Sequence, residues 1–254
     1  MDKVNNIKFL HIIQKAMAMI MPVTLVGSLF SLLAGIPIEG YQTFIANIGL
    51  LDAFNLVYNC TYGYYSLIMV FCVAYQYSVA YKQRKNALAA GVVAICAFLI
   101  SCPQDKLAQY VGTMGIMGSF VVGIVVAKIM KTLVEKNITI KLPDGVPPMV
   151  SQSFVALIPS LVVFTVFMLV NIVLKNTSLG SFQSMVYTLL RKPLTIVGAN
   201  AAGELFMVCY GTLLWMFGIH GGMIMMPIIS VVFQELKMEN LAVYQAGGIA
   251  PNRY

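Results

Sequence analysis

Long apolar stretches constrain this chain more than any other feature of its sequence. Each holds at most one charged residue away from its ends, and those near membrane-spanning length lie at 16–36, 62–80, 87–102, 110–130, 150–174 and 201–217. A helix needs about 20 apolar residues to cross a hydrocarbon core. Backbone groups in lipid must pair among themselves, and unbroken runs of this length exclude short alternating barrel strands. We therefore predict an all-α membrane protein with about six transmembrane helices.

The composition excludes a soluble globular domain. Charged residues make up 10% of the chain, hydrophobic residues make up 59%, and the mean hydropathy is +0.85. Soluble domains carry about 25% charged residues. The net charge of +7 does not indicate a nucleic-acid partner, because the basic residues sit between the apolar blocks and form no stripe.

The basic residues between the blocks predict the orientation of the chain. With the N-terminus in the cytoplasm, only Lys106 falls outside before residue 149, and those that fall inside are Lys3, Lys8, Lys15, Lys82, Arg84, Lys85, Lys128, Lys131, Lys136 and Lys141. This bias follows the positive-inside rule, so we expect a multi-pass protein of the cytoplasmic (inner) membrane. We expect the connection 37–61 to be external, with its stretch 43–57 lying on or dipping into the membrane.

Small residues at helical spacing predict close helix packing. They occur in the first block at Gly27, Ser31 and Gly35, and in the fourth at Gly112, Gly115 and Gly118. Packing between helices is the expected role of both sets.

Residues 179–196 differ from the apolar blocks. One set of apolar residues repeats at helical spacing (Phe182, Met185, Val186, Leu189 and Leu190), and polar residues occupy the other positions (Ser181, Ser184, Thr188, Arg191 and Lys192). This pattern predicts an amphipathic helix along the membrane interface, ended or kinked by Pro193. We place a domain boundary near residue 178, with a five-helix unit over 1–178 and a second unit over 179–254.

His220 is the strongest candidate for a functional residue. It lies in the apolar segment 218–234, which is interrupted by Gly218, Gly221, Gly222 and Pro227. We predict a broken helix or re-entrant hairpin arm here, since interrupted helices often build substrate sites in transporters. Ionisable residues at membrane depth usually face a cavity or a partner, and an imidazole can hydrogen-bond a sugar hydroxyl. The alternative is a structural histidine bonded to the backbone.

Glu204 and Trp215 form a second candidate pair. Glu204 is the only acidic residue within a predicted span, and Trp215 is the only tryptophan. On a straight helix they share one face with Val208 and Gly211. A carboxylate can hold sugar hydroxyls, and an indole can stack on a sugar ring. Alternatively, Glu204 lies near the helix end and reaches the membrane surface.

Other chemistry is not indicated. The five cysteines show no Cys-x-x-Cys or Cys/His spacing, so we expect no metal site, and no pattern indicates a cofactor or a catalytic residue. The segment 140–150, with Pro143-Asp-Gly and Pro147-Pro148, is either a rigid turn that starts a helix or a docking surface.

Two sequence stretches carry a resemblance to a known family. LPDGVPPMVSQSFVALIPS at 142–160 and LLWMFGIHGG at 213–222 resemble motifs of the membrane (IIC) component of the phosphoenolpyruvate-dependent sugar phosphotransferase system, in its lactose/cellobiose/diacetylchitobiose branch. The resemblance implies a sugar permease for a β-linked disaccharide. It also implies partner IIA and IIB proteins, of which IIB phosphorylates the sugar. It further implies a homodimer built on the first five helices, and a sugar site to which His220 and Trp215 contribute. The residue arguments above add Gly218, Gly221 and Glu204 as candidates for this site.

The chain also departs from this family. Family members are longer, and no Asn-Glu-Pro motif occurs here. A truncated, frameshifted or split subunit is therefore one expectation. Two other functions stay open: a non-transporting interaction or regulatory protein that pairs with a full-length permease, and an ion-coupled transporter that would need Glu204 as its coupling carboxylate.

Overall fold

The computed structural model describes residues 8–143, 145–189 and 201–216, together with 240, 243, 248 and 249. Within these ranges the chain is helical and contains no strand. The α-helices are α2 (Lys8–Ala34), α3 (Glu39–Asn47), α4 (Leu50–Tyr62), α5 (Tyr65–Ala80), α6 (Ala87–Ser101), α7 (Leu107–Val111), α8 (Ile116–Glu135), α9 (Pro148–Lys175) and α11 (Ala201–Met216). Short 3₁₀ turns are η1 (Arg84–Asn86), η2 (Gln104–Lys106) and η3 (Thr113–Gly115), and residues 182–189 form a further helix.

Five helical segments are long and apolar enough to span a membrane: His11–Ala34, Leu50–Ala80, Arg84–Ser101, Ile116–Glu135 and Val150–Lys175. They confirm five of the predicted blocks. The sixth block contains α11, which is helical from Ala201 to Met216 as predicted. The all-α membrane fold is therefore the fold of the described chain.

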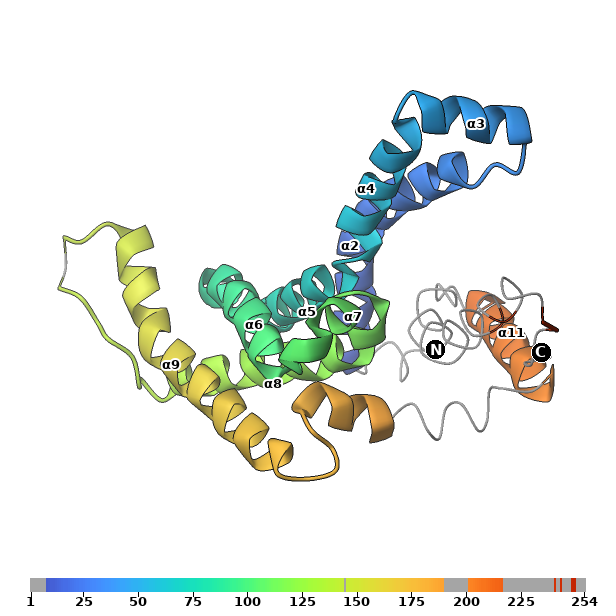
Figure 1. Cartoon of the computed structure of the whole chain (residues 1–254). Helices are drawn as coiled ribbons and strands as arrows, with labels where there is room; N and C mark the ends of the chain where they lie inside the picture. The colour runs from blue at the N-terminus through green and yellow to red at the C-terminus, as the bar shows by residue number, and fades with distance from the viewer. Residues whose placement is uncertain are drawn as a thin grey trace.

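The connection 37–61 is helical rather than an irregular loop. It forms α3 and α4, and α4 runs back beside α2, so that the three helices project from the bundle as an arm (Figure 1). A turn at Gly63 and Tyr64 separates α4 from α5. The second predicted span thus begins at Leu50, because the apolar character of 50–61 continues that of the following helix.

Glycine allows α2 and α4 to approach each other closely. A Cβ added to Gly27 would overlap the Thr61 side chain on α4. The Tyr62 hydroxyl donates to the Thr24 carbonyl across the same contact, at 3.3 Å. The prediction that these glycines serve helix packing is therefore confirmed at Gly27 but not at Gly35, which follows the end of α2 and where an added Cβ would meet only backbone carbonyls of α2.

The fourth predicted block is interrupted near its start. Its backbone is extended at Gly112, between α7 and η3, and the continuous helix α8 begins only at Ile116. The Ser66 hydroxyl on α5 donates to the Gly112 carbonyl, which pairs a backbone group that the interruption frees. The spacing of Gly112, Gly115 and Gly118 predicted a single helix face, and this prediction is wrong because the helix is interrupted between them.

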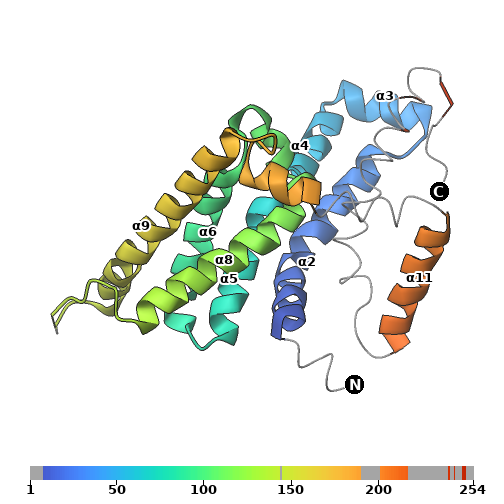
Figure 2. The same ribbon diagram turned by 90° about the horizontal axis from the view of Figure 1, so that it is seen from below.

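The bundle core lies among α5, α6, α8 and α9, which pack side by side (Figure 2). On α6 small residues at positions 90, 94 and 97 are fully or almost fully buried. They face β-branched residues of the neighbouring helices, including Val70, Val122 and Val163, each with no exposed surface. Small side chains on one helix opposite branched ones on the next bring the helix axes close.

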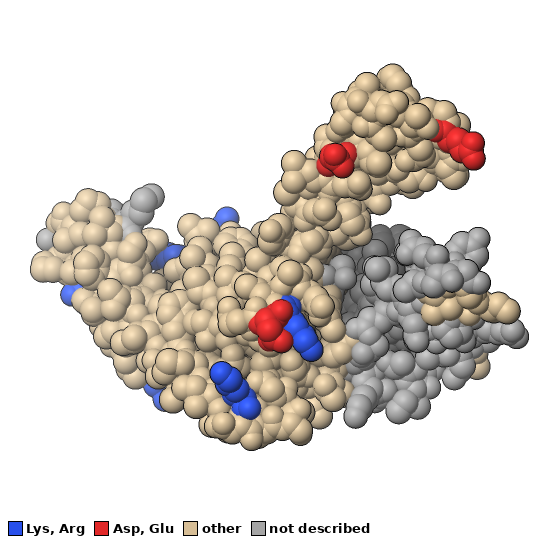
Figure 3. All heavy atoms as spheres, viewed as in Figure 1, with Lys and Arg blue, Asp and Glu red and all other residues tan. Residues whose placement is uncertain are grey.

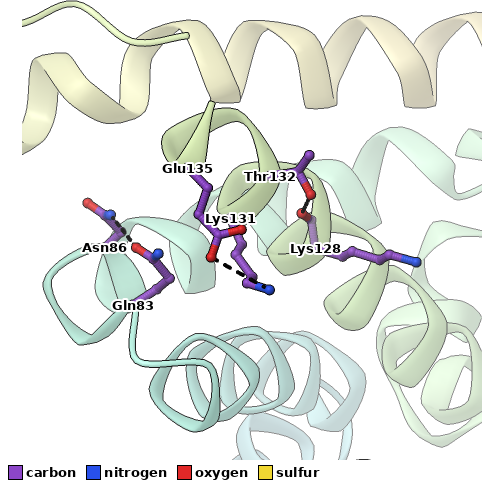
Figure 4. Close-up of polar contacts among 6 residues, drawn as sticks. All are labelled: Gln83, Asn86, Lys128, Lys131, Thr132 and Glu135. Carbon is purple, nitrogen blue, oxygen red and sulfur yellow. Dashed lines mark hydrogen bonds and ion pairs between the residues drawn. The ribbon is translucent and has the colours of Figure 1, made fainter. Parts of the chain in front are cut away.

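A cluster of aromatic and basic side chains joins three helix ends at one end of the bundle. The Nζ atoms of Lys8 and Lys131 lie 5.3 and 4.6 Å from the ring centre of Tyr81, within cation–π range. Lys131 also pairs with Glu135 at 3.7 Å, one helical turn away on α8 (Figure 4). Lys8 and Lys131 are among the basic residues that the orientation argument places in the cytoplasm.

Polar side chains hold the helix 182–189 against the opposite end of the bundle. Gln183, which is 1% exposed, donates from Nε2 to the Ser101 hydroxyl at 2.8 Å. Asn171 on α9 donates to the Ile100 carbonyl and accepts from the Phe182 backbone N–H. Residues 182–189 of the predicted amphipathic helix are thus helical, but the side facing the protein includes a buried amide, and Leu189 of the predicted apolar set is 61% exposed. Pro193, where we predict an end or kink, lies outside the described residues.

Gly118 and Gln183 provide a test of this docking. A Cβ on Gly118 would overlap the Gln183 amide, so Gly118→Ala should lower the detergent unfolding midpoint. Gln183→Ala should cost about 0.5–1.5 kcal/mol for the lost hydrogen bond, plus lost packing. The double variant should be more stable than the summed costs predict, since the shorter side chain at position 183 leaves room for the new methyl group. Thr188→Ala on the same helix is the control, and strictly additive costs would contradict the contact.

Candidate functional site

The predicted sugar-site residues fall partly outside the described part of the chain. His220, Gly218 and Gly221, together with the predicted broken helix over 218–234, lie outside the described residues, so the structure does not test their predicted roles. Glu204 and Trp215 lie within α11, whose helical backbone is described, whereas their side chains are not. The structure therefore fixes the places of these two residues along one helix.

Helix α11 is continuous across the predicted site face. Because it has no break between Ala201 and Met216, Glu204 and Trp215 share one face, three turns apart. Between them Val208 is 61% exposed, and Gly211, which offers no side chain, is half-buried. Other positions around α11, such as Leu205 and Leu213, are exposed as well, so exposure alone does not distinguish this face.

Two aromatic residues on α11 were missed by the sequence analysis. Phe206 and Tyr210 stack with ring centres 5.9 Å apart, and both are exposed. The signal was available, since they are aromatic and four residues apart on a helix. They point away from the Glu204 face, because Phe206 follows Glu204 by about 200° around the helix.

Helix α11 stands apart from the bundle core. In both ribbon views it lies beyond α2, on the side away from α9 (Figures 1 and 2). The candidate sugar-site face is thus carried by a different part of the molecule from the packed helices α5 to α9.

A separate cavity lies between the ends of α6 and α9, at the end of the bundle on which helix 182–189 packs, called here the docked end. It measures about 590 Å³, and its lining includes Ile100, Met168, Ile172, Lys106 and Lys175. Its amides are engaged, since Gln104 donates to the carbonyls of Leu99 and Cys102. Burial raises the pKa of the lining thiol Cys102 to about 12, so this thiol is protonated at neutral pH and is a poor nucleophile.

Charge is sparse on the surface of the described chain. Figure 3 shows one face, on which uncharged side chains predominate; an acidic and a basic side chain lie side by side near its centre. No group of three His, Cys, Asp or Glu residues that could hold a metal ion occurs among the residues with described positions.

Comparisons with known proteins place this fold in a family. The family model "Phosphotransferase system, EIIC" matches residues 14–253. The chain is 33% identical over 96% of its length to the cellobiose-specific EIIC component of Geobacillus stearothermophilus, and 29% identical over 98% to the oligo-beta-mannoside-specific EIIC component of Bacillus subtilis (strain 168). It covers 58% and 59% of these relatives.

A solved structure agrees with the sequence relatives. The crystal structure of the transporter ChbC, the IIC component from the N,N'-diacetylchitobiose-specific phosphotransferase system, superimposes with a TM-score of 0.82 at 31% identity. The match covers 99% of this chain and 62% of that one. The chain thus spans about three fifths of the length of these proteins. With a family match over nearly all of its residues and several membrane-spanning helices, the chain belongs to the EIIC family of multi-pass membrane proteins of the phosphotransferase system.

Proposed function

We propose that this chain serves the uptake of a β-linked disaccharide, such as cellobiose, lactose or diacetylchitobiose, by the phosphotransferase system. The family match over residues 14–253 carries this proposal. It is supported by relatives described as specific for cellobiose, oligo-beta-mannosides and lactose, and by the fold shared with a diacetylchitobiose IIC component. In this proposal a IIB protein, itself supplied by a IIA protein, phosphorylates the sugar at the cytoplasmic face.

The proposed orientation places the N-terminus in the cytoplasm. Its support is the basic end of the bundle, where Lys8 and Lys131 flank Tyr81. Cytoplasmic loops carry the excess of Lys and Arg in membrane proteins. The positive charge at this end also suits the approach of a phosphorylated, hence anionic, partner protein.

We also propose a homodimer and a division of the chain near residue 178. The first five spans, 1–178, would form the dimerisation unit, and 179–254 would begin the sugar-transport unit. The arm offers an apolar surface for a second copy, since Leu25, Leu32 and Leu56 are each more than 60% exposed. The separate position of α11 supports a second unit, although helix 182–189 packs on the first.

Sugar uptake by the full chain tests the proposed function. Sealed membrane vesicles containing the chain should accumulate labelled cellobiose only as the phosphorylated sugar, and only with phosphorylated IIB protein inside as the phosphoryl donor. Omission of IIB is the control. Accumulation of unphosphorylated sugar without IIB would contradict the proposal. Absence of any uptake, together with co-purification with a full-length permease, would favour the non-transporting interaction or regulatory protein.

The two histidines of the chain allow a matched test of the sugar site. We propose that His220 hydrogen-bonds a sugar hydroxyl, so His220→Gln should weaken disaccharide binding about two- to twelvefold, the cost of one such bond. Binding can be followed by the fluorescence of Trp215, the only tryptophan. His11 is exposed at the start of α2, so His11→Gln should bind normally. Equal binding by both variants and the parent chain would contradict the role of His220.

A substitution at Glu204 distinguishes phosphotransferase-linked sugar uptake from ion-coupled transport. If its carboxylate accepts from a sugar hydroxyl, Glu204→Gln should weaken binding about tenfold, because hydrogen bonds to charged groups are the stronger ones. Uptake by the variant should still depend on phosphorylated IIB protein and not on a proton gradient. Uptake that follows the proton gradient in the parent chain and loses this dependence in the variant would instead favour the ion-coupled transporter.

A further inference from the structure

The two basic residues at the docked end of the bundle line the same cavity. In the described part of the chain, the remaining basic residues belong to the end of the bundle where Lys8 and Lys131 meet Tyr81, or to the loops beside it. Lys106, in η2, and Lys175, at the end of α9, both border the cavity between α6 and α9. A bias that keeps lysine away from one membrane face makes such a pair a specific feature.

The charge at the cavity is positive and unpaired. No ion pair is formed by Lys106 or Lys175 within the described ranges, and Asp105 is the only carboxylate in the lining. Both lysines are exposed, so their ammonium groups can reach an anion without first breaking an internal contact. The charged part of the cavity therefore suits an anionic group.

Beside the lysines, the lining combines amides and hydroxyls with an apolar side, and part of that apolar side belongs to α9. Ile100, Met168 and Ile172 line it, and on the same helix Met168 and Ile172 are 47% and 54% exposed. Because α9 is long and apolar enough to span a membrane, this exposed surface is accessible to lipid chains in the described chain. At about 590 Å³ the cavity falls within the usual range of small-molecule sites, about 300–1,000 Å³.

We propose that this cavity binds the headgroup of an anionic phospholipid, with an acyl chain along the exposed side of α9. Lys106 and Lys175 neutralise the headgroup phosphate, and Ile172 and Met168 contact the chain. Basic pockets between membrane helices bind anionic headgroups on the cytoplasmic side of membranes, and the proposed site uses the same charge pairing on the opposite side, where the orientation argument places Lys106. An occupant that is both charged and apolar matches this lining better than a free anion or a sugar does. The inference goes beyond the proposed sugar uptake and does not depend on it.

Lipid binding by the purified full chain tests this site. The probe is phosphatidylglycerol in detergent, measured by native mass spectrometry, with phosphatidylcholine as the neutral lipid. Lys106→Gln/Lys175→Gln should weaken phosphatidylglycerol binding about 25-fold, at about fivefold for each lysine near a headgroup. Lys85→Gln/Lys136→Gln removes the same charge from exposed positions at the other end and should bind like the parent chain. Equal loss in the two double variants would overturn the site.

Two further variants keep the test decisive if the glutamine pair folds poorly. Lys106→Arg/Lys175→Arg preserves the charge and should retain binding, whereas Asp105→Asn removes the opposing carboxylate and should tighten binding severalfold. Loss of binding in the arginine pair, or no gain in Asp105→Asn, would contradict the charge-based site. Inorganic phosphate at matched concentration should not displace the lipid, and full displacement would point to a free-anion site instead.

Discussion

The pairing of backbone hydrogen bonds in an apolar medium determines the architecture of this protein. Where the chain crosses hydrocarbon it is helical, because water is absent there and the backbone groups must find partners in their own segment. Breaks occur where side chains supply the missing partners. Ser66 donates to the freed carbonyl of Gly112, and Asn171 donates to that of Ile100 at the end of α6. At these two places a polar side chain hydrogen-bonds a backbone carbonyl that the end of a helix leaves without a helical partner.

The two ends of the bundle are consequently held together by different chemistry. At the basic end, exposed and half-buried lysines surround Tyr81, so the contact depends on charge and is accessible to water. At the other end, amides and hydroxyls such as Gln183 and Ser101 pair with little exposure. Buried neutral hydrogen bonds cost more to break than exposed charge contacts. Helix 182–189 is therefore firmly attached to the first five spans.

Much of the fold could be predicted from the sequence, because length and hydropathy decide whether a segment spans a membrane. The start of α9 at Pro148 also agrees with the expected turn, since proline is favoured in the first helical turn. Hydropathy could not locate the break at Gly112 or the burial of Gln183, because both depend on partners distant in sequence. For the site, helical spacing correctly put Glu204 and Trp215 on one continuous helix. The environment of His220 cannot be derived from spacing, because it depends on how its glycine-interrupted segment folds.

The position of the sugar site can be argued from what the described bundle offers. The cavity between α6 and α9 is lined by aliphatic, amide, hydroxyl and charged side chains, with no aromatic ring in its lining. Disaccharides bind through stacking of their apolar faces on aromatic rings, together with hydrogen bonds from carboxylates and amides. The cavity supplies hydrogen-bonding groups without an aromatic ring, whereas α11 brings a carboxylate position and an indole position onto one helix face. The proposed sugar site on α11 therefore fits this chemistry better than the cavity lining does, and the proposed lipid, with its charged headgroup and apolar tail, fits the lysine-lined cavity.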